Sequence, residues 1–175
     1  MRLLALAATA LLLASCGRLD EVDITRTASG TIPGAAGAPP LAIPALAGFG
    51  LMLDEATLRA NGIEPKDVDS AKVVGLRLAV TNGTTFEAWL DAVSFFVEAQ
   101  GLPRVLVAQK NGIRSAPPGT TVVELTTPGV DLKPYVVAPS ATIVVEASGS
   151  QPAAATTIEA TATIRVNVNV TGLLH

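Results

Sequence analysis

Histidine, cysteine and aromatic residues are scarce in this chain of 175 residues. The one histidine is His175, the last residue, so a Ser-His-Asp hydrolase is excluded and general-base chemistry lacks its usual side chain. The one cysteine, Cys16, excludes an internal disulfide and a zinc site built from several cysteines. Aromatic side chains make up only 3% of the chain, which leaves little material for a platform on which ligands stack.

Charged residues are also few, at 15%, with 12 Lys and Arg against 15 Asp and Glu. The resulting net charge of -3 argues against nucleic acid as a partner, because contacts to phosphates need a basic surface. Apolar residues account for 49% of the chain, and its length suits one domain around one core.

The N-terminal segment carries the most specific signal. A positively charged start, Met1-Arg2, precedes an unbroken run of Leu, Ala and one Thr over residues 3–13. The run matches the apolar region of a secretory signal peptide and is shorter than the roughly 20 residues that a membrane-spanning helix needs. It ends in Leu13-Ala14-Ser15-Cys16. This box resembles the lipobox of bacterial lipoproteins, in which a branched apolar residue and two small residues precede an obligatory cysteine.

The resemblance implies a diacylglyceryl thioether on Cys16, cleavage just before it, and acylation of the new amino group, commonly by palmitate. The residue after the cysteine is Gly17. Enterobacterial lipoproteins that stay at the inner membrane carry Asp there, so the resemblance favours the outer membrane. The alternative is a cytosolic protein with an apolar N-terminal helix and an incidental cysteine.

The rest of the chain divides simply. We expect a signal peptide over residues 1–15, a tether over 16–20 and a single domain over 21–175. Residues 30–50 contain five Gly and four Pro, which excludes helix and central strand, but they also contain large apolar residues such as Phe49. This predicts an apolar loop over an open end of the core; a segment that contacts a partner or the membrane is the alternative. One short helix is expected near 54–61, with Asp54 as its N-cap and Asn61-Gly62 as its stop.

From residue 72 onward, apolar and polar residues alternate with a period of two. Together with a first strand near 21–28, this predicts an all-β protein, an antiparallel β-sandwich of about eight strands. The final strand, over 157–171, is unusually long, and we expect it to bend near Ala160 or Ala162 and to pair in two sheets. A lipocalin-like barrel around a ligand is the open alternative.

Several stretches of this body resemble a loose group of uncharacterised bacterial lipoproteins of myxobacterial-type genomes. They are residues 67–72, 86–98, 101–108, 131–135 and 147–152. The resemblance implies a lipid anchor and a β-sandwich, and it carries no activity.

Few residues suggest chemistry. Asp67 and Asp69 alternate as calcium ligands do, but the Gly and distal Glu of an EF-hand loop are missing, so we expect a turn. Glu87 and Asp91 flank Trp89, which would suit a sugar site; the alternative, which we favour, is that Trp89 and Phe86 fill the core.

Phe96 points opposite to Phe95 in the expected strand. We expect it to be buried under the apolar Gly/Pro loop, with an exposed contact point as the alternative.

The sequence therefore predicts a lipoprotein of the bacterial outer membrane that is not an enzyme and has no catalytic residue, metal or cofactor. Its one assigned site is Cys16, and its ligand site is unknown. The expected role is a structural, adaptor or binding module whose partners are the membrane and an envelope protein. The alternative is a carrier of a small apolar or lipid ligand in an internal cavity.

Overall fold

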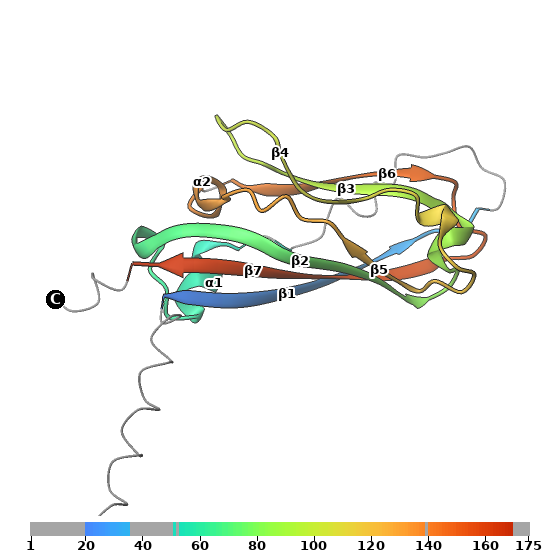
Figure 1. Ribbon diagram of the computed structural model, residues 1–175, viewed down its shortest axis with the longest axis horizontal. Coiled ribbons are helices and arrows are strands. Elements are labelled where there is room, and N and C mark those ends of the chain that lie inside the picture. Colours follow the sequence, from blue (N-terminus) through green and yellow to red (C-terminus); the bar gives the residue numbers. More distant parts are fainter. Residues whose placement is uncertain (1–19, 36–50, 52, 139, 170–175) are drawn as a thin grey trace, which may run out of the picture.

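A computed structural model of the chain describes residues 20–35, 51, 53–138 and 140–169. The residues expected to form the signal peptide, Cys16 and residues 36–50 of the expected Gly/Pro-rich loop lie outside these residues. The loop expected at 30–50 begins later than predicted, because residues 30–32 belong to a strand. Within the described residues, all strand pairing is antiparallel, and two sheets pack face to face (Figure 1).

The larger sheet has the strand order β1-β7-β2-β5 and the smaller one the order β4-β3-β6. The strands are β1 (Glu21–Ile32), β2 (Val68–Asn82), β3 (Leu90–Glu98), β4 (Val105–Lys110), β5 (Val122–Leu125), β6 (Thr142–Gly149) and β7 (Thr156–Val168). The predicted all-β antiparallel sandwich is confirmed, with seven strands in the described residues where about eight were expected.

The two sheets are joined along one side. Gln109, in β4, and Thr126, just after β5, exchange backbone hydrogen bonds of 2.9 and 2.8 Å. One isolated bridge therefore links β4 and the end of β5, which are edge strands of the two sheets.

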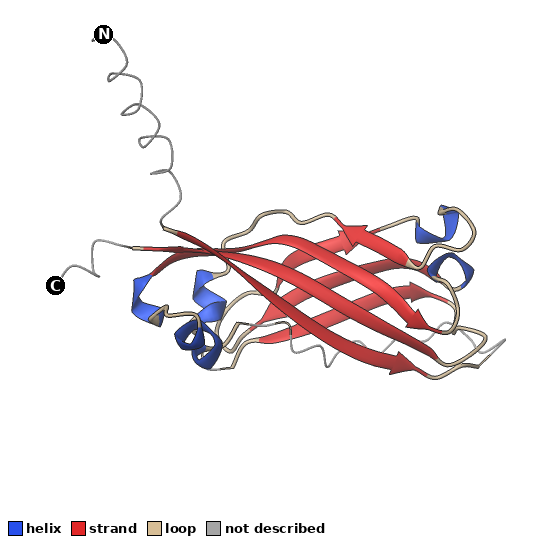
Figure 2. Ribbon diagram, turned by 90° about the horizontal axis from the view of Figure 1, so that it is seen from below, coloured by secondary structure: helices blue, strands red, loops and turns tan. Residues whose placement is uncertain are grey.

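The last strand differs from its prediction. β7 pairs with β1 and β2, which both lie in the larger sheet, so it does not divide its pairing between two sheets. Its register with β1 runs unbroken from Glu21 to Ile32. The three register shifts occur instead in the pairing of β7 with β2. Bulges increase local twist, which is visible in the larger sheet in Figure 2.

The period-two pattern correctly predicts which face of β7 is buried. The core-facing residues are Ile158, Ala160, Ala162, Ile164, Val166 and Val168, all at most 9% exposed. The opposite face carries Thr, Asn, Glu and Arg, which are half-buried. Hydroxyls of paired strands meet there, as between Thr31 and Thr157 at 3.0 Å.

The predicted helix is present as α1 (Glu55–Ala60). The Asp54 carboxylate accepts a hydrogen bond of 2.7 Å from the backbone N–H of Thr57, as an N-cap does. Gly62 follows with a φ of 75°, the left-handed conformation expected of the stop. The described residues also form four shorter elements: α2 (Lys133–Val136), η2 (Pro65–Asp67), η3 (Phe86–Ala88) and η4 (Ile113–Ser115).

The prediction that Phe96 is buried is wrong. Phe95 is fully buried, but Phe96 lies on the outer face of the smaller sheet and is only half-buried. The Arg104 guanidinium lies 3.8 Å from the centre of its ring, and the same guanidinium forms ion pairs with Glu98 and Glu146. A cation-π contact thus covers the ring, which alternation alone does not reveal.

Candidate functional site

The predicted lipidation site, Cys16, precedes the first described residue, Asp20, by four positions. The Asp20 carbonyl accepts a hydrogen bond of 2.7 Å from the backbone N–H of Val168, and Asn169 donates one of 2.8 Å to the Asp67 carbonyl. These bonds bring the start of β1, the end of β7 and η2 together at one end of the sandwich. No helix among the described residues is long and apolar enough to cross a bilayer.

We call this the N-terminal end, made of Asp20, α1, η2, α2 and the turn 99–104 (Figure 1). The Asp131 carboxylate fixes α2 there, because it accepts hydrogen bonds of 3.0 Å from the backbone N–H groups of Ala71 and Lys133. The Tyr135 hydroxyl donates to the Pro103 carbonyl at 2.5 Å, which joins α2 to the turn. The opposite or far end carries η3, η4 and the loop 150–155 (Figure 2).

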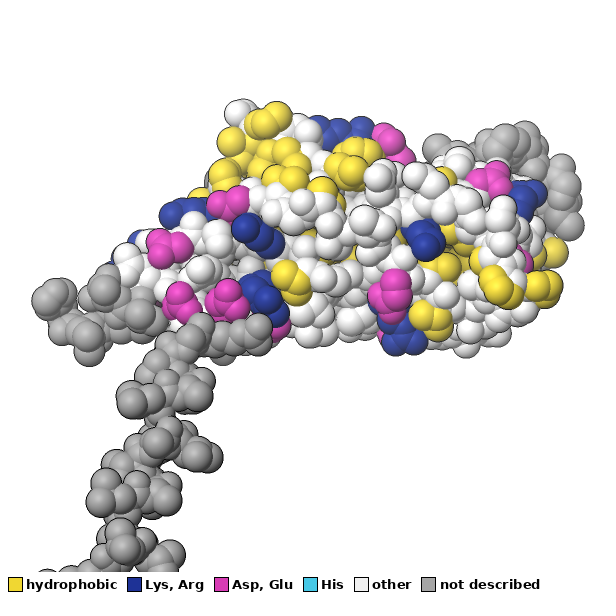
Figure 3. Space-filling model, in the orientation of Figure 1, with side chains coloured by type: hydrophobic (Ala, Val, Ile, Leu, Met, Phe, Trp, Pro, Cys, Tyr) yellow, Lys and Arg dark blue, Asp and Glu magenta, His cyan; other side chains and the backbone are white. Residues whose placement is uncertain are grey.

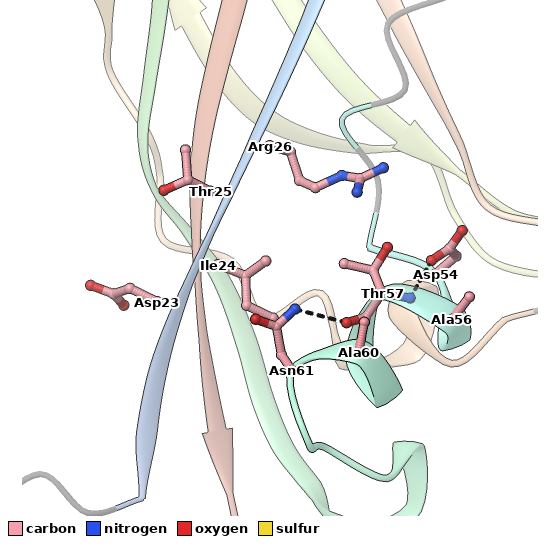
Figure 4. A pocket seen from close by; sticks show the side chains of 9 residues that line it. All are labelled: Asp23, Ile24, Thr25, Arg26, Asp54, Ala56, Thr57, Ala60 and Asn61. Atoms are coloured by element: carbon pink, nitrogen blue, oxygen red, sulfur yellow. Dashed lines mark hydrogen bonds between the residues drawn. The ribbon is translucent and has the colours of Figure 1, made fainter.

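A polar groove of about 540 Å³ separates β1 from α1. Figure 4 shows its side chains: Asp23, Ile24, Thr25 and Arg26 from β1, with Asp54, Ala56, Thr57, Ala60 and Asn61 from the α1 region. Hydrogen bonds from Thr57 hold the pKa of Asp54 below its usual value, with a smaller contribution from the charge of Arg26. The groove is shallow and its polar groups are dispersed, so it does not resemble a catalytic centre.

A second groove, of about 430 Å³, lies between α1 and α2. Most of its lining is apolar: Leu53, Ala56, Pro65, Val136, Val137, Ala138 and Ala141, with Asp54 and Glu55 at its edge. We call it the α1–α2 groove. It opens at the N-terminal end, where the chain enters the fold.

Among the described residues, a small cavity of about 20 Å³ lies between the sheets, lined by apolar side chains that include Val73, Phe95 and Leu132. That volume holds about one water molecule, whereas pockets for small ligands have on the order of 300–1,000 Å³.

The carboxylates singled out from the sequence do not converge. Glu87 accepts hydrogen bonds from the Thr85 hydroxyl (2.7 Å) and from the backbone N–H groups of Gly119 (2.8 Å) and Thr120 (3.1 Å). These bonds, the one from Thr85 first, hold the pKa of Glu87 below its usual value. Asp91 instead forms an ion pair with Arg114. Each carboxylate thus fastens a loop at the far end.

Trp89 fills the core, which is the favoured one of its two predicted roles. Its side chain is 1% exposed, its ring centre lies 6.1 Å from that of Phe86, and its indole N–H donates to the Thr84 carbonyl at 3.3 Å. A buried indole cannot stack on a sugar, so the sugar-site hypothesis is wrong.

Asp67 and Asp69 lie at the N-terminal end, in η2 and at the start of β2. Among the described residues, no group of three or more His, Cys, Asp or Glu side chains is placed to hold a metal ion.

The sequence did not predict the two grooves or the role of Glu87 in fastening a loop. Two of the three partners of Glu87 lie 32 and 33 positions along the chain, and no local pattern connects them to it. The α1–α2 groove joins segments some 80 residues apart, and its only sequence signal was the short helix itself. Neither a scan against models of protein families nor a search of curated proteins finds a match to this chain.

Proposed function

We propose that this protein is a lipoprotein of the bacterial outer membrane, anchored through Cys16, and that its domain acts as a non-catalytic adaptor or binding module of the envelope. The observation that carries the proposal is the N-terminal pattern. A basic start, an apolar run over 3–13 and Leu-Ala-Ser-Cys stand in the order that lipoprotein processing requires, with the chain's one cysteine at the modified position.

The geometry of the carboxylates supports a non-catalytic role. Glu87 and Asp91 are engaged in fastening loops, and Asp67 lies at the opposite end of the sandwich from them. Glycoside hydrolysis, the reaction that Glu87 and Asp91 suggested, needs two carboxylates around one bond.

The cavity between the sheets favours an adaptor over a carrier. Among the described residues, this cavity of about 20 Å³ is too small for a lipid chain. An adaptor works through its surface and needs no internal volume.

The anchor is tested by Cys16→Ala. We expect the precursor to stay unlipidated and uncut, because the thioether cannot form without the sulfur. The protein should then lose membrane attachment, since it takes two or more acyl chains to hold a protein stably. Detergent partitioning and mass spectrometry of the N-terminal peptide measure both effects.

Ser15→Ala is the matched control, because it keeps a small residue before the cleavage point and leaves the thiol in place. It should be lipidated and cut normally. An intact Met1 or an unmodified Cys16 thiol in the mature wild-type protein would contradict the proposal.

A further inference from the structure

The proposed anchor limits how far the fold can stand from the bilayer. Asp20 follows Cys16 by four positions, and a chain extends by at most about 3.6 Å per residue, so the Cα atom of Asp20 must lie within about 14 Å of that of Cys16. Asp20 is hydrogen-bonded to Val168, so this short reach applies to the folded sandwich itself.

The N-terminal end also exposes apolar side chains. Val137, directly after α2, is 46% exposed, the highest value among the exposed large hydrophobic residues of the described part of the chain. It lines the α1–α2 groove with Leu53, Val136 and Ala138. In Figure 3, hydrophobic side chains gather over α2 and the β3–β4 turn.

The charges at this end are mixed, and its carboxylates include Asp20, Glu64, Asp67 and Asp69. Asp54 caps α1, Glu55 pairs with Arg59 at 2.6 Å, and Asp131 accepts two backbone hydrogen bonds. The basic side chains of Lys66 and Lys133 lie at the same end, in η2 and α2. Contact with a bilayer would therefore depend on apolar burial rather than on a basic patch.

We infer that the N-terminal end is a membrane-contacting surface, in which Val137 and the α1–α2 groove lie against the lipid of the bilayer that holds the anchor. This inference rests on the proposed function, since without lipid on Cys16 nothing brings this end to a membrane. It goes beyond the anchor because it assigns an orientation: the sandwich meets the bilayer end-on, and η3 and η4 point away from it.

The test uses the lipidated full-length chain in phosphatidylcholine–phosphatidylglycerol vesicles. Because the sulfur of Cys16 is taken up by the thioether, Val137→Cys introduces the one thiol that a polarity-sensitive dye can label. The matched control is Val122→Cys, since Val122 is 40% exposed but lies in β5 opposite Ala79, toward the far end. We expect nitroxide-labelled lipids to quench the dye at Val137→Cys at least about threefold more than at Val122→Cys, with a blue-shifted emission.

Equal quenching at the two positions in protein that mass spectrometry shows to be lipidated would overturn the orientation and leave the anchor standing. A blue shift at Val137→Cys without quenching by nitroxide lipids would show that another protein surface covers this end, and would also overturn the inference. An unmodified Cys16 would end both the inference and the proposed function.

Discussion

Glu87 illustrates how single side chains hold the far end together. Its two carboxylate oxygens accept three hydrogen bonds, which connect η3 to the turn at Gly119 and Thr120. Because the charged form receives these bonds, the pKa of Glu87 is lower in the folded chain than the ordinary 4.5. The stabilisation is present above the unfolded pKa and is lost as the pH falls through the lower, folded value.

Glu87→Gln should therefore lower the melting temperature at pH 7, because an amide keeps the shape but presents a donor to one of the three N–H or O–H groups. The difference from wild type should shrink as the pH falls through the lowered pKa of Glu87, because the carboxyl then becomes protonated. Circular dichroism melts at pH 7 and over a series of acidic pH values measure it. A difference that does not change with pH would show that the hydrogen bonds to the charged form are unimportant.

Asp91→Asn is the control for this variant. Both side chains of its ion pair with Arg114 are about half exposed, so loss of the pair should lower the free energy of unfolding by at most about 1 kcal/mol. Both variants should keep envelope function in a complementation assay. Loss of function in either variant, with folding and lipidation intact, would refute the non-catalytic proposal.

Residues whose role is local were predictable from sequence, and those whose role depends on distant partners were not. Asp54 accepts its capping hydrogen bond from Thr57, three positions later, so the local spacing sufficed to predict it. Phe96 was misplaced because its covering group, Arg104, reaches it across the β3–β4 turn. A cation-π pair produces no periodic pattern in a sequence from which it could be predicted.

Among the elements, β7 has the clearest alternation of apolar and polar residues, yet its pairing in two sheets was predicted wrongly. Alternation identified its buried face because the side-chain period of a strand is fixed at two. It could not identify its neighbours, because β1 and β2 are separated from β7 by long stretches of chain. Pairing partners are decided by topology, which a single strand does not encode.

Two substitutions in β7 test the assignment of its faces. Val166→Asp places a charge at a fully buried position and should cost several kcal/mol or prevent folding. Thr163→Asp changes a half-buried residue on the polar face, between Thr25 and Gly75, and should cost about 1 kcal/mol or less. Urea titrations of the two variants measure both values, and equal losses would show that the face is misassigned.

At the scale of the whole molecule, the sequence correctly predicted an all-β fold with two antiparallel layers. It did not predict that β4 and β5 join the sheets along one side, nor that the described chain enters and leaves at the same end. Both depend on how strands distant in sequence pack. The α1–α2 groove arises in the same way, from two short helices brought together by their strands.

The unbroken pairing of β1 with β7 has a mechanical consequence. If the anchor pulls on Asp20 while a partner holds the far end, the force runs along β1, and the hydrogen bonds to β7 lie across it. Twelve paired residues then resist together, so the strand is loaded in shear. Pulling Asp20 away from Val168, at the same end, would instead open the pairs one after another.

Single-molecule pulling can compare the two geometries on one sandwich, with handles at Asp20 and Ala153 or at Asp20 and Val168. We expect the first to rupture at a force several times higher than the second, and similar forces would show that the β1–β7 pairing does not bear the load. A module joined to a membrane through its first strand would thus be built to transmit tension along its length without coming apart.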